Sequence, residues 1–110
     1  MNRYELYSVN LDPTIGAEIK KTRPCVIVSP DEMNKHLLTV QVAPLTSQER
    51  LIPSRIKIAA TPTSGLKNDS FAALDQLKTI DKQRCCAFIG KISEKEARAI
   101  ADVLCKMFQY

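Results

Sequence analysis

Histidine, glycine and aromatic residues are scarce in this chain of 110 residues, and tryptophan is absent. With only one histidine, His36, the chain lacks the residues of a two-histidine ribonuclease centre or a cysteine-histidine hydrolase. Its three glycines form neither a Gly-x-Gly-x-x-Gly fingerprint nor a P-loop, so the common nucleotide-binding motifs are missing. No pair of carboxylates with a glycosidase pattern can be identified either. Any catalysis must therefore depend on other groups.

Long apolar runs and metal-binding cysteine motifs are also missing. No apolar run approaches the roughly 20 residues that span a bilayer, and the N-terminus has no apolar signal-peptide core. We therefore expect a cytoplasmic protein without membrane contact. The cysteines Cys25, Cys85, Cys86 and Cys105 contain no Cys-x-x-Cys pair, and His36 is far in sequence from the adjacent pair. We expect no metal and no cofactor, and we expect Cys25, Cys105 and one of the adjacent pair to be small core residues.

The chain does have enough apolar residues for one core. Its length is that of a common domain, so residues 1–110 are expected to form a single domain. The hydrophobic content of 45% is sufficient for a mainly aliphatic core, and the charged fraction of 25% is ordinary for a folded protein. The net charge of +4 is compatible with a polyanionic partner such as RNA but does not require one.

Hydrophobic periodicity predicts a mainly β fold with a C-terminal helix. Alternating or continuous apolar patterns predict strands over residues 4–11, 25–29, 37–45, 55–58, 70–80 and 84–89, with a short helical turn or loop over 30–34. Ser93 and Glu96 form a capping-box pattern, and apolar residues from Ala97 to Phe108 then follow at helical spacing. The expected architecture, of the α+β class, is a small, mostly antiparallel β-barrel closed or flanked by this helix.

Polar residues suited to catalysis or binding are dispersed along the chain, and their clearest group lies in the loop before the apolar run at Cys25. Glu18 and Arg23 share this loop, where they can approach each other. Thr46 and Asp75 complete the set. Each also has an ordinary interpretation. Glu18 can be a solvated carboxylate, and Arg23 can form a surface ion pair. Thr46 can cap a turn, and Asp75 can be a strand residue that faces solvent. By themselves these residues predict a β-barrel with an anion-binding loop and no more.

Four segments spread over the chain carry a specific pattern. They are Asp-Pro-Thr-Ile-Gly-Ala-Glu at 12–18, Arg-Pro-Cys-Val-Ile-Val-Ser-Pro at 23–30, Val-Ala-Pro-Leu-Thr-Ser at 42–47 and Leu-Asp-Gln-Leu-Lys-Thr-Ile-Asp at 74–81. Together with the length and the C-terminal helix, this pattern closely resembles the MazF/PemK/Kid family of toxin endoribonucleases. The resemblance covers nearly the whole chain.

The resemblance implies an SH3-like β-barrel that forms a homodimer and acts as the toxin of a type II toxin-antitoxin system. It implies sequence-specific, metal-independent cleavage of single-stranded mRNA, in which the ribose 2′-OH attacks its own phosphate. The products would carry a 2′,3′-cyclic phosphate and a 5′-OH. The resemblance also implies a MazE-like or PemI-like antitoxin that inhibits through an acidic C-terminal segment, and contact with operator DNA only through that antitoxin.

The resemblance also assigns roles to individual residues. Arg23 and Thr46 match catalytic positions at the scissile phosphate, while Glu18 and Asp75 are alternatives for the base. Some relatives add a histidine before the loop glutamate and an arginine two residues before the aspartate. This chain has alanines there, so the proton donor stays unassigned. The expected RNA contacts are Lys20, Lys21, Thr22, Ser47, Gln48, Arg50, Gln76 and Lys78, with Lys67 as a further candidate.

Two other functions on the same fold stay open. One is a CcdB-like toxin that binds gyrase without catalysis, and the other is a member that binds RNA or its antitoxin without cleaving. Retention of the loop with Glu18 and Arg23, and of Thr46, argues against a gyrase binder, whereas the two alanines leave a non-catalytic member open. The loop that carries Glu18 is expected to be a mobile flap over the RNA backbone.

Overall fold

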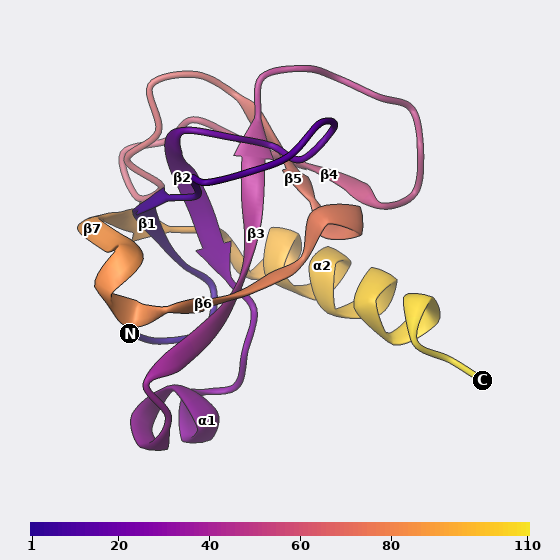
Figure 1. Ribbon diagram of the computed structural model, residues 1–110. Helices are drawn as coiled ribbons and strands as arrows, with labels where there is room; N and C mark the ends of the chain where they lie inside the picture. The colour runs from indigo at the N-terminus through magenta and orange to yellow at the C-terminus, as the bar shows by residue number, and fades with distance from the viewer.

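The computed structural model describes residues 1–110 as a mainly β structure with a C-terminal helix (Figure 1). The elements are β1 (Glu5–Asn10), β2 (Thr22–Ile27), α1 (Asp31–His36), β3 (Thr39–Thr46), β4 (Arg55–Ile58), β5 (Ser70–Ala73), the 3-10 turn η1 (Leu74–Gln76), β6 (Lys78–Asp81), the 3-10 turn η2 (Lys82–Arg84), β7 (Cys85–Lys91) and α2 (Glu94–Met107). Neither α1 nor α2 combines the length and apolar character that a membrane crossing requires. The strands and the C-terminal helix confirm the predicted fold class.

Strand β3 lies at the centre of the sheet, in which neighbouring strands follow the order β4-β5-β3-β2-β1-β7. One edge of β3 pairs with β2. The other edge is shared, because Val40 pairs with Ile80 of β6 and Leu45 pairs with Ala72 of β5. Every pairing is antiparallel, as the sequence predicts.

The segment 70–80, predicted as one long strand, is instead divided by the turn η1. β5 ends at Ala73 and β6 begins at Lys78. Leu74 is fully buried in the turn, and its carbonyl accepts a hydrogen bond from the N–H of Leu77. Because neither Gly nor Pro marks this turn, the sequence pattern does not predict it. The break takes Asp75 out of the strand ladder, and its side chain becomes available for other contacts.

The connection between β4 and β5, residues 59–69, joins the two ends of the sheet. It reaches β7, where the N–H of Lys91 donates to the carbonyl of Thr63 at 3.0 Å. The approach is too close for side chains: a Cβ on Gly90 would lie 2.2 Å from the carbonyl oxygen of Ser64. A Cβ on Gly65, which has φ of +69°, would lie 2.3 Å from the carbonyl oxygen of Ile89. These glycines allow the sheet to curl into a barrel-like form.

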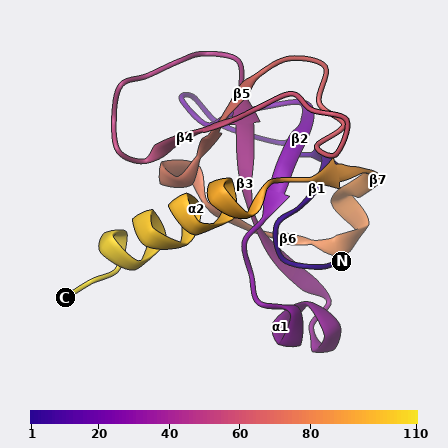
Figure 2. The ribbon, with the colours of Figure 1, turned by 180° about the vertical axis from the view of Figure 1, so that it is seen from behind.

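Helix α2 packs across one side of the sheet, and its C-terminal end extends past the strands (Figure 2). It begins with the predicted capping box: Ser93 Oγ accepts from the N–H of Glu96 at 3.1 Å, and Glu96 Oε1 accepts from the N–H of Ser93 at 2.9 Å. The second carboxylate oxygen of Glu96 accepts from the N–H of Ala59 at 2.8 Å, which ties the helix to the end of β4. Ala97 and Ile100 enter the core.

The core consists of a larger cluster under α2 and a smaller cluster of seven buried residues around β1, β2 and β3. Cys25 belongs to the smaller cluster, and burial raises the pKa of its thiol to about 12. Cys85 is half-buried beside it, whereas Cys86 and Cys105 are exposed. The prediction of a core residue is confirmed for Cys25. It is wrong for Cys105, because the helix turns that side chain away from the core.

Candidate functional site

The loops that carry most of the predicted site residues gather at one end of the molecule, opposite α1 (Figure 1). They are the β1–β2 loop (residues 11–21), the β3–β4 loop (residues 47–54) and the β4–β5 loop (residues 59–69). These loops meet because β2 and β3 run antiparallel, so the start of β2 lies beside the end of β3. The sheet therefore brings polar segments together that are far apart in the sequence.

Arg23 and Thr46 line a common hollow at this end. Its volume is about 390 Å³. The residues around it are Arg23, Pro24, Leu45, Thr46, Ser47, Gly65, Leu66, Lys67, Asn68, Ser70 and Ile89. β2 begins at Thr22, three residues earlier than predicted, so Arg23 is a strand residue that pairs with Val9 of β1. The strand pairing fixes the backbone from which the guanidinium extends.

Both side chains leave donors free for a ligand. Arg23 Nε donates to the carbonyl of Lys20 at 2.8 Å, and the terminal guanidinium nitrogens have no hydrogen-bond or ion-pair partner in the chain. Thr46 is only 9% exposed, and its Oγ1 accepts from the N–H of Gln48 at 3.2 Å. Its hydroxyl hydrogen is not used within the chain. The hollow therefore offers a fork of guanidinium donors and a hydroxyl donor to an anion.

The wall formed by the β4–β5 loop depends on Ser64, a residue that sequence reasoning missed. Ser64 is 1% exposed. Its hydroxyl donates to the carbonyl of Ala59 at 2.9 Å and accepts from the N–H groups of Thr61 at 2.9 Å and Leu66 at 3.3 Å. Thr61 Oγ1 accepts from the N–H of Ser64 in return, at 3.0 Å. The short spacing from threonine to serine just before Gly65 is the only local signal for this turn.

A second hollow contains the other predicted catalytic residues. Its volume is about 480 Å³, and its lining consists of Leu11, Ala17, Glu18, Ile19, Pro44, Asp75, Gln76, Leu77 and Lys78. The structure thus brings Glu18 and Asp75 together but places them apart from Arg23 and Thr46. The two hollows are adjacent at the end of β3, where Pro44 lines one and Leu45 and Thr46 line the other.

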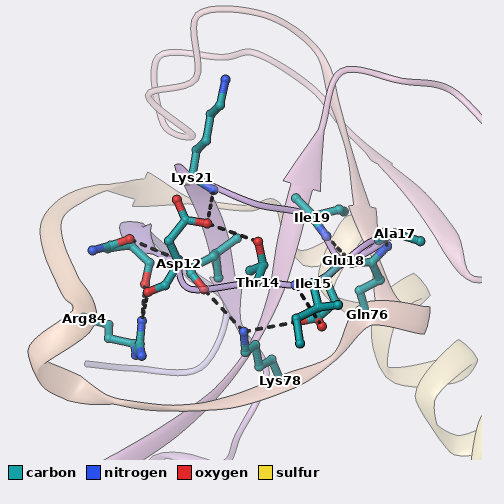
Figure 3. A network of polar contacts seen from close by, with 12 residues as sticks. Asp12, Thr14, Ile15, Ala17, Glu18, Ile19, Lys21, Gln76, Lys78 and Arg84 are labelled. Atoms are coloured by element: carbon teal, nitrogen blue, oxygen red, sulfur yellow. Dashed lines mark hydrogen bonds and ion pairs between the residues drawn. The ribbon is translucent and has the colours of Figure 1, made fainter.

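The β1–β2 loop, expected to be a mobile flap, is docked onto η1 and β6 in the structure (Figure 3). Gln76 Oε1 accepts from the N–H of Ile19 at 2.6 Å, and Gln76 Nε2 donates to the carbonyl of Ala17 at 3.2 Å. Lys78 Nζ donates to the carbonyl of Leu11 at 3.4 Å and lies 3.9 Å from Glu18 Oε1. The Gln76 amide, predicted to contact RNA, is therefore bonded to the loop at both polar atoms, and Lys78 Nζ, also predicted to contact RNA, lies against the loop.

The base of the same loop is closed by Asp12. Asp12 Oδ1 accepts from the N–H of Lys21 at 3.2 Å and from Thr14 Oγ1 at 3.1 Å. Arg84 donates to the main-chain carbonyl of Asp12 and, at 3.2 Å, to that of Asn10 (Figure 3). Both ends of the loop are thus held together by a side chain of the loop itself and by η2.

Asp75 is held by an ion pair that the sequence did not indicate. Arg55 Nε and Nη2 donate to its two carboxylate oxygens at 2.7 and 3.0 Å, and Ser54 Oγ donates to Oδ1 at 2.9 Å. The Arg55 side chain is only 7% exposed, whereas that of Asp75 is 37% exposed. The hydrogen bonds from Arg55 lower the pKa of Asp75 to about 2, against the opposing effect of burial. The interpretation of Asp75 as a strand residue that merely faces solvent is wrong.

The PemK-like, MazF-like toxin family of type II toxin-antitoxin systems matches residues 2–108 of the chain. The chain belongs to this family. It is 33% identical to the endoribonuclease MazF9 of Mycobacterium tuberculosis strain ATCC 25618 / H37Rv, over 94% of this chain and 92% of the relative. The predicted family and enzyme class, a toxin endoribonuclease, are thereby confirmed.

Solved structures show the same fold. MazF of Deinococcus radiodurans superposes with a TM-score of 0.85 at 19% identity, covering 100% of this toxin and 97% of that chain. An endoribonuclease from a mycobacterial species, solved with its cognate antitoxin, superposes with a TM-score of 0.77 at 22% identity and covers 96% of this toxin and 92% of that chain. Both relatives confirm the architecture of the toxin.

The remaining predicted contact residues of the toxin are exposed, all of them on the loops except Thr22, which begins β2. They are Lys20, Lys21, Thr22, Ser47, Gln48, Arg50 and Lys67. None of the lysines and arginines among them takes part in an ion pair. No three His, Cys, Asp or Glu side chains gather as a metal-binding group would. These lysines and this arginine are therefore available to a negatively charged ligand.

Proposed function

We propose that this toxin cleaves single-stranded mRNA at specific sequences, without a metal, by attack of the ribose 2′-OH on the adjacent phosphate. The products carry a 2′,3′-cyclic phosphate and a 5′-OH. The observation that carries the proposal is the shared hollow of Arg23 and Thr46, with free donors and unpaired basic residues around it. Because the substrate supplies the nucleophile, the protein needs only a base, stabilisation of the charged intermediate and a proton for the leaving oxygen.

Arg23 and Thr46 hold the scissile phosphate in this proposal. The planar guanidinium fork matches two phosphate oxygens, and charge that develops on the pentacoordinate phosphorane strengthens these hydrogen bonds. The loss of one such donor lowers kcat by about 10²- to 10³-fold in comparable sites. Arg23 acts by electrostatic stabilisation, since a guanidinium with a pKa above about 12 is a poor proton donor.

Glu18 is the base, in preference to Asp75. A general base works best when its pKa lies near the working pH, and a carboxylate whose pKa is held at about 2 by two hydrogen bonds from Arg55 is poorly suited to accept a proton. The Glu18 side chain is 51% exposed, and it has no arginine partner; its Oε2 accepts from the N–H of Ile15 at 3.2 Å. Arg23 Nε donates to the carbonyl of Lys20. Because Glu18 is two residues from Lys20, their Cα atoms are at most about 7 Å apart. This places the backbone of Glu18 near the guanidinium that holds the phosphate in this proposal.

The exposed loop residues grip the RNA backbone. Lys20, Lys21 and Arg50 neutralise phosphates, while Thr22, Ser47 and Gln48 provide hydrogen-bonding groups for phosphates and unpaired bases. For single strands, each phosphate contact steepens the fall of the logarithm of the binding constant with the logarithm of the salt concentration by about 0.7. Binding therefore weakens steeply as the salt concentration rises.

The partners of the toxin follow from its family and its charge. An antitoxin with an acidic segment lies across the positive loops and inhibits by occupying the RNA site, which agrees with the toxin-antitoxin description of the family. The toxin forms a homodimer, consistent with large apolar side chains left in solvent, such as Leu51 at 93% exposure and Phe108 at 70%. Operator DNA is contacted only through the antitoxin. The substrate places its action in the cytoplasm.

The test is cleavage of a long single-stranded RNA in excess EDTA, with analysis of the fragment ends. We expect discrete fragments with 5′-OH ends from the wild type and none from Arg23→Ala. Arg98→Ala is the matched control, because Arg98 lies on α2 in an exposed pair with Glu94. Absence of cleavage, or cleavage that EDTA abolishes, contradicts the proposal. Growth arrest that persists in Arg23→Ala would favour a gyrase-binding or non-catalytic toxin instead.

A further inference from the structure

Gln76 holds the β1–β2 loop at the two peptide groups that flank Glu18. Its Oε1 accepts from the N–H of Ile19 at 2.6 Å, on one side of Glu18, and its Nε2 donates to the carbonyl of Ala17 at 3.2 Å, on the other (Figure 3). The Gln76 amide thus bonds one N–H and one carbonyl of the loop, as the backbone of a neighbouring β-strand would. No other side chain bonds the backbone of the loop on both sides of Glu18.

The turn that presents Gln76 is itself fixed from the other side. The N–H of Leu74 donates to the carbonyl of Ser54 at 2.9 Å, and the N–H of Leu77 donates to the carbonyl of Leu74 at 3.2 Å. Within the turn, the Asp75 carboxylate receives the bidentate hydrogen bonds of Arg55. Buried Leu74 and nearly buried Arg55 leave the turn little freedom to shift.

We propose that Gln76 is a positioning residue for Glu18, and that Asp75 acts by fixing the turn that carries Gln76. This inference rests on the proposed function, in which Glu18 is the base. A base must meet the 2′-OH within hydrogen-bonding distance, and a misplacement of about 1 Å can cost about 10²-fold in rate. Glu18 lies on the β1–β2 loop, and the hydrogen bonds between this loop and Gln76 of the turn give Glu18 a defined position.

A positioning role differs from the predicted role of Gln76 as an RNA contact. An RNA contact that is equal in the ground state and the transition state would raise KM when removed and leave kcat unchanged. A positioning group for the base lowers kcat and leaves KM nearly unchanged. The structure favours positioning, because both polar atoms of the Gln76 amide are already bonded to the loop.

The experiment compares Gln76→Ala and Gln76→Glu with the wild type. Gln83 provides the matched controls, Gln83→Ala and Gln83→Glu, because it is an exposed glutamine in the other 3-10 turn and its side chain makes no hydrogen bond. Measurements are kcat and KM on a short RNA, the pH profile of kcat, and hydrogen exchange of the Ile19 amide in the free toxin. Melting temperatures show whether each variant is folded.

In Gln76→Ala we expect kcat to fall roughly 10- to 100-fold, as a misplaced base requires, with little change in KM and faster exchange of the Ile19 amide. Gln76→Glu keeps the acceptor for Ile19 but replaces the donor to the Ala17 carbonyl with a carboxylate oxygen, so the exchange protection of Ile19 should fall less than in Gln76→Ala. Its carboxylate lies beside Glu18, which otherwise faces Lys78 and shares its hollow with Asp75, so the acidic limb of the pH profile should move to higher pH. Both Gln83 variants should behave as the wild type.

Two results overturn the inference. One is unchanged exchange at Ile19 in Gln76→Ala, which would show that the amide does not hold the loop. The other is a higher KM with unchanged kcat, which would make Gln76 an RNA contact. Failure of the proposed function is a separate result, because a wild type that does not cleave RNA would still report on the loop through the exchange of Ile19.

Discussion

The ion pair between Arg55 and Asp75 predicts a pH-dependent part of the toxin's stability. The pKa of Asp75 is lowered from 3.8 to about 2, mainly by hydrogen bonds from Arg55. At about 1.4 kcal/mol for each tenfold change, this corresponds to about 2 kcal/mol. Because the Asp75 side chain is 37% exposed, solvent screening reduces the figure to between about 1 and 2 kcal/mol. Asp75→Asn should destabilise the toxin by that amount at neutral pH.

The direction of the pH dependence follows from the sign of the change in pKa. The folded-state pKa of Asp75 lies below the unfolded value, so the unfolded state binds its proton first as the pH falls. The stabilisation is therefore complete above the unfolded value of 3.8 and is lost as the pH falls towards about 2. The difference in stability between the wild type and Asp75→Asn should shrink over this range and persist at every higher pH.

The assay is urea unfolding at a fixed protein concentration, repeated between neutral pH and about pH 2.5 across the range over which a carboxylate titrates. For a chain of this size the expected loss at neutral pH lowers the melting temperature by roughly 4–8 °C. Asp102→Asn is the control, because Asp102 pairs with Lys106 on the exposed face of α2, where such a pair is worth about 0.3–0.5 kcal/mol. A loss in Asp75→Asn that is equal at both pH extremes, or no loss at all, would refute the reasoning.

Three further predictions concern the scaffold. Gly90→Ala should destabilise the toxin by roughly 1–3 kcal/mol in urea unfolding, because the new Cβ would lie 2.2 Å from the carbonyl oxygen of Ser64; unchanged stability would show that the β4–β5 loop yields freely. Ser93→Ala should lower the free energy of unfolding by about 1 kcal/mol, measured by thermal unfolding, through loss of the capping box. Ser93→Thr should keep most of this stability. In the native toxin at pH 8, a chromogenic disulfide reagent should react rapidly with the exposed Cys86 and Cys105 and not with Cys25, whose pKa is raised to about 12 by burial; rapid labelling of Cys25 would contradict its placement in the core.

Much of the fold could be predicted from the sequence, because it depends on local patterns. The α2 helix follows from the capping box of Ser93 and Glu96 and from apolar spacing, which are properties of neighbouring residues. The alternation over residues 37–45 likewise predicts a strand, which the structure has as β3 (Thr39–Thr46). In contrast, η1 has no Gly or Pro and depends on burial of Leu74 beneath the sheet, which no local pattern encodes.

The candidate site was predictable to a similar extent. The short segments of the family resemblance identify Arg23 and Thr46, and the antiparallel pairing of β2 with β3 brings them to one hollow. The same segments cannot separate Glu18 from Asp75 as the base. What sets the two carboxylates apart is Arg55, which pairs with Asp75 and is 20 residues from it in the sequence. Nor can they reveal that the Gln76 amide is occupied by a loop 57 residues away.

The sequence by itself therefore determined the family, the mainly β fold with its C-terminal helix, and the identity of the groups that can meet a phosphate. These follow from residue type and from spacing along the chain. Only the tertiary structure decided which of these groups is free. Arg23 keeps its terminal donors, while Asp75 and Gln76 are bound to residues distant in the sequence. The physical reason is that hydrogen bonds and charge pairing depend on distance in space, and the sheet brings those partners together.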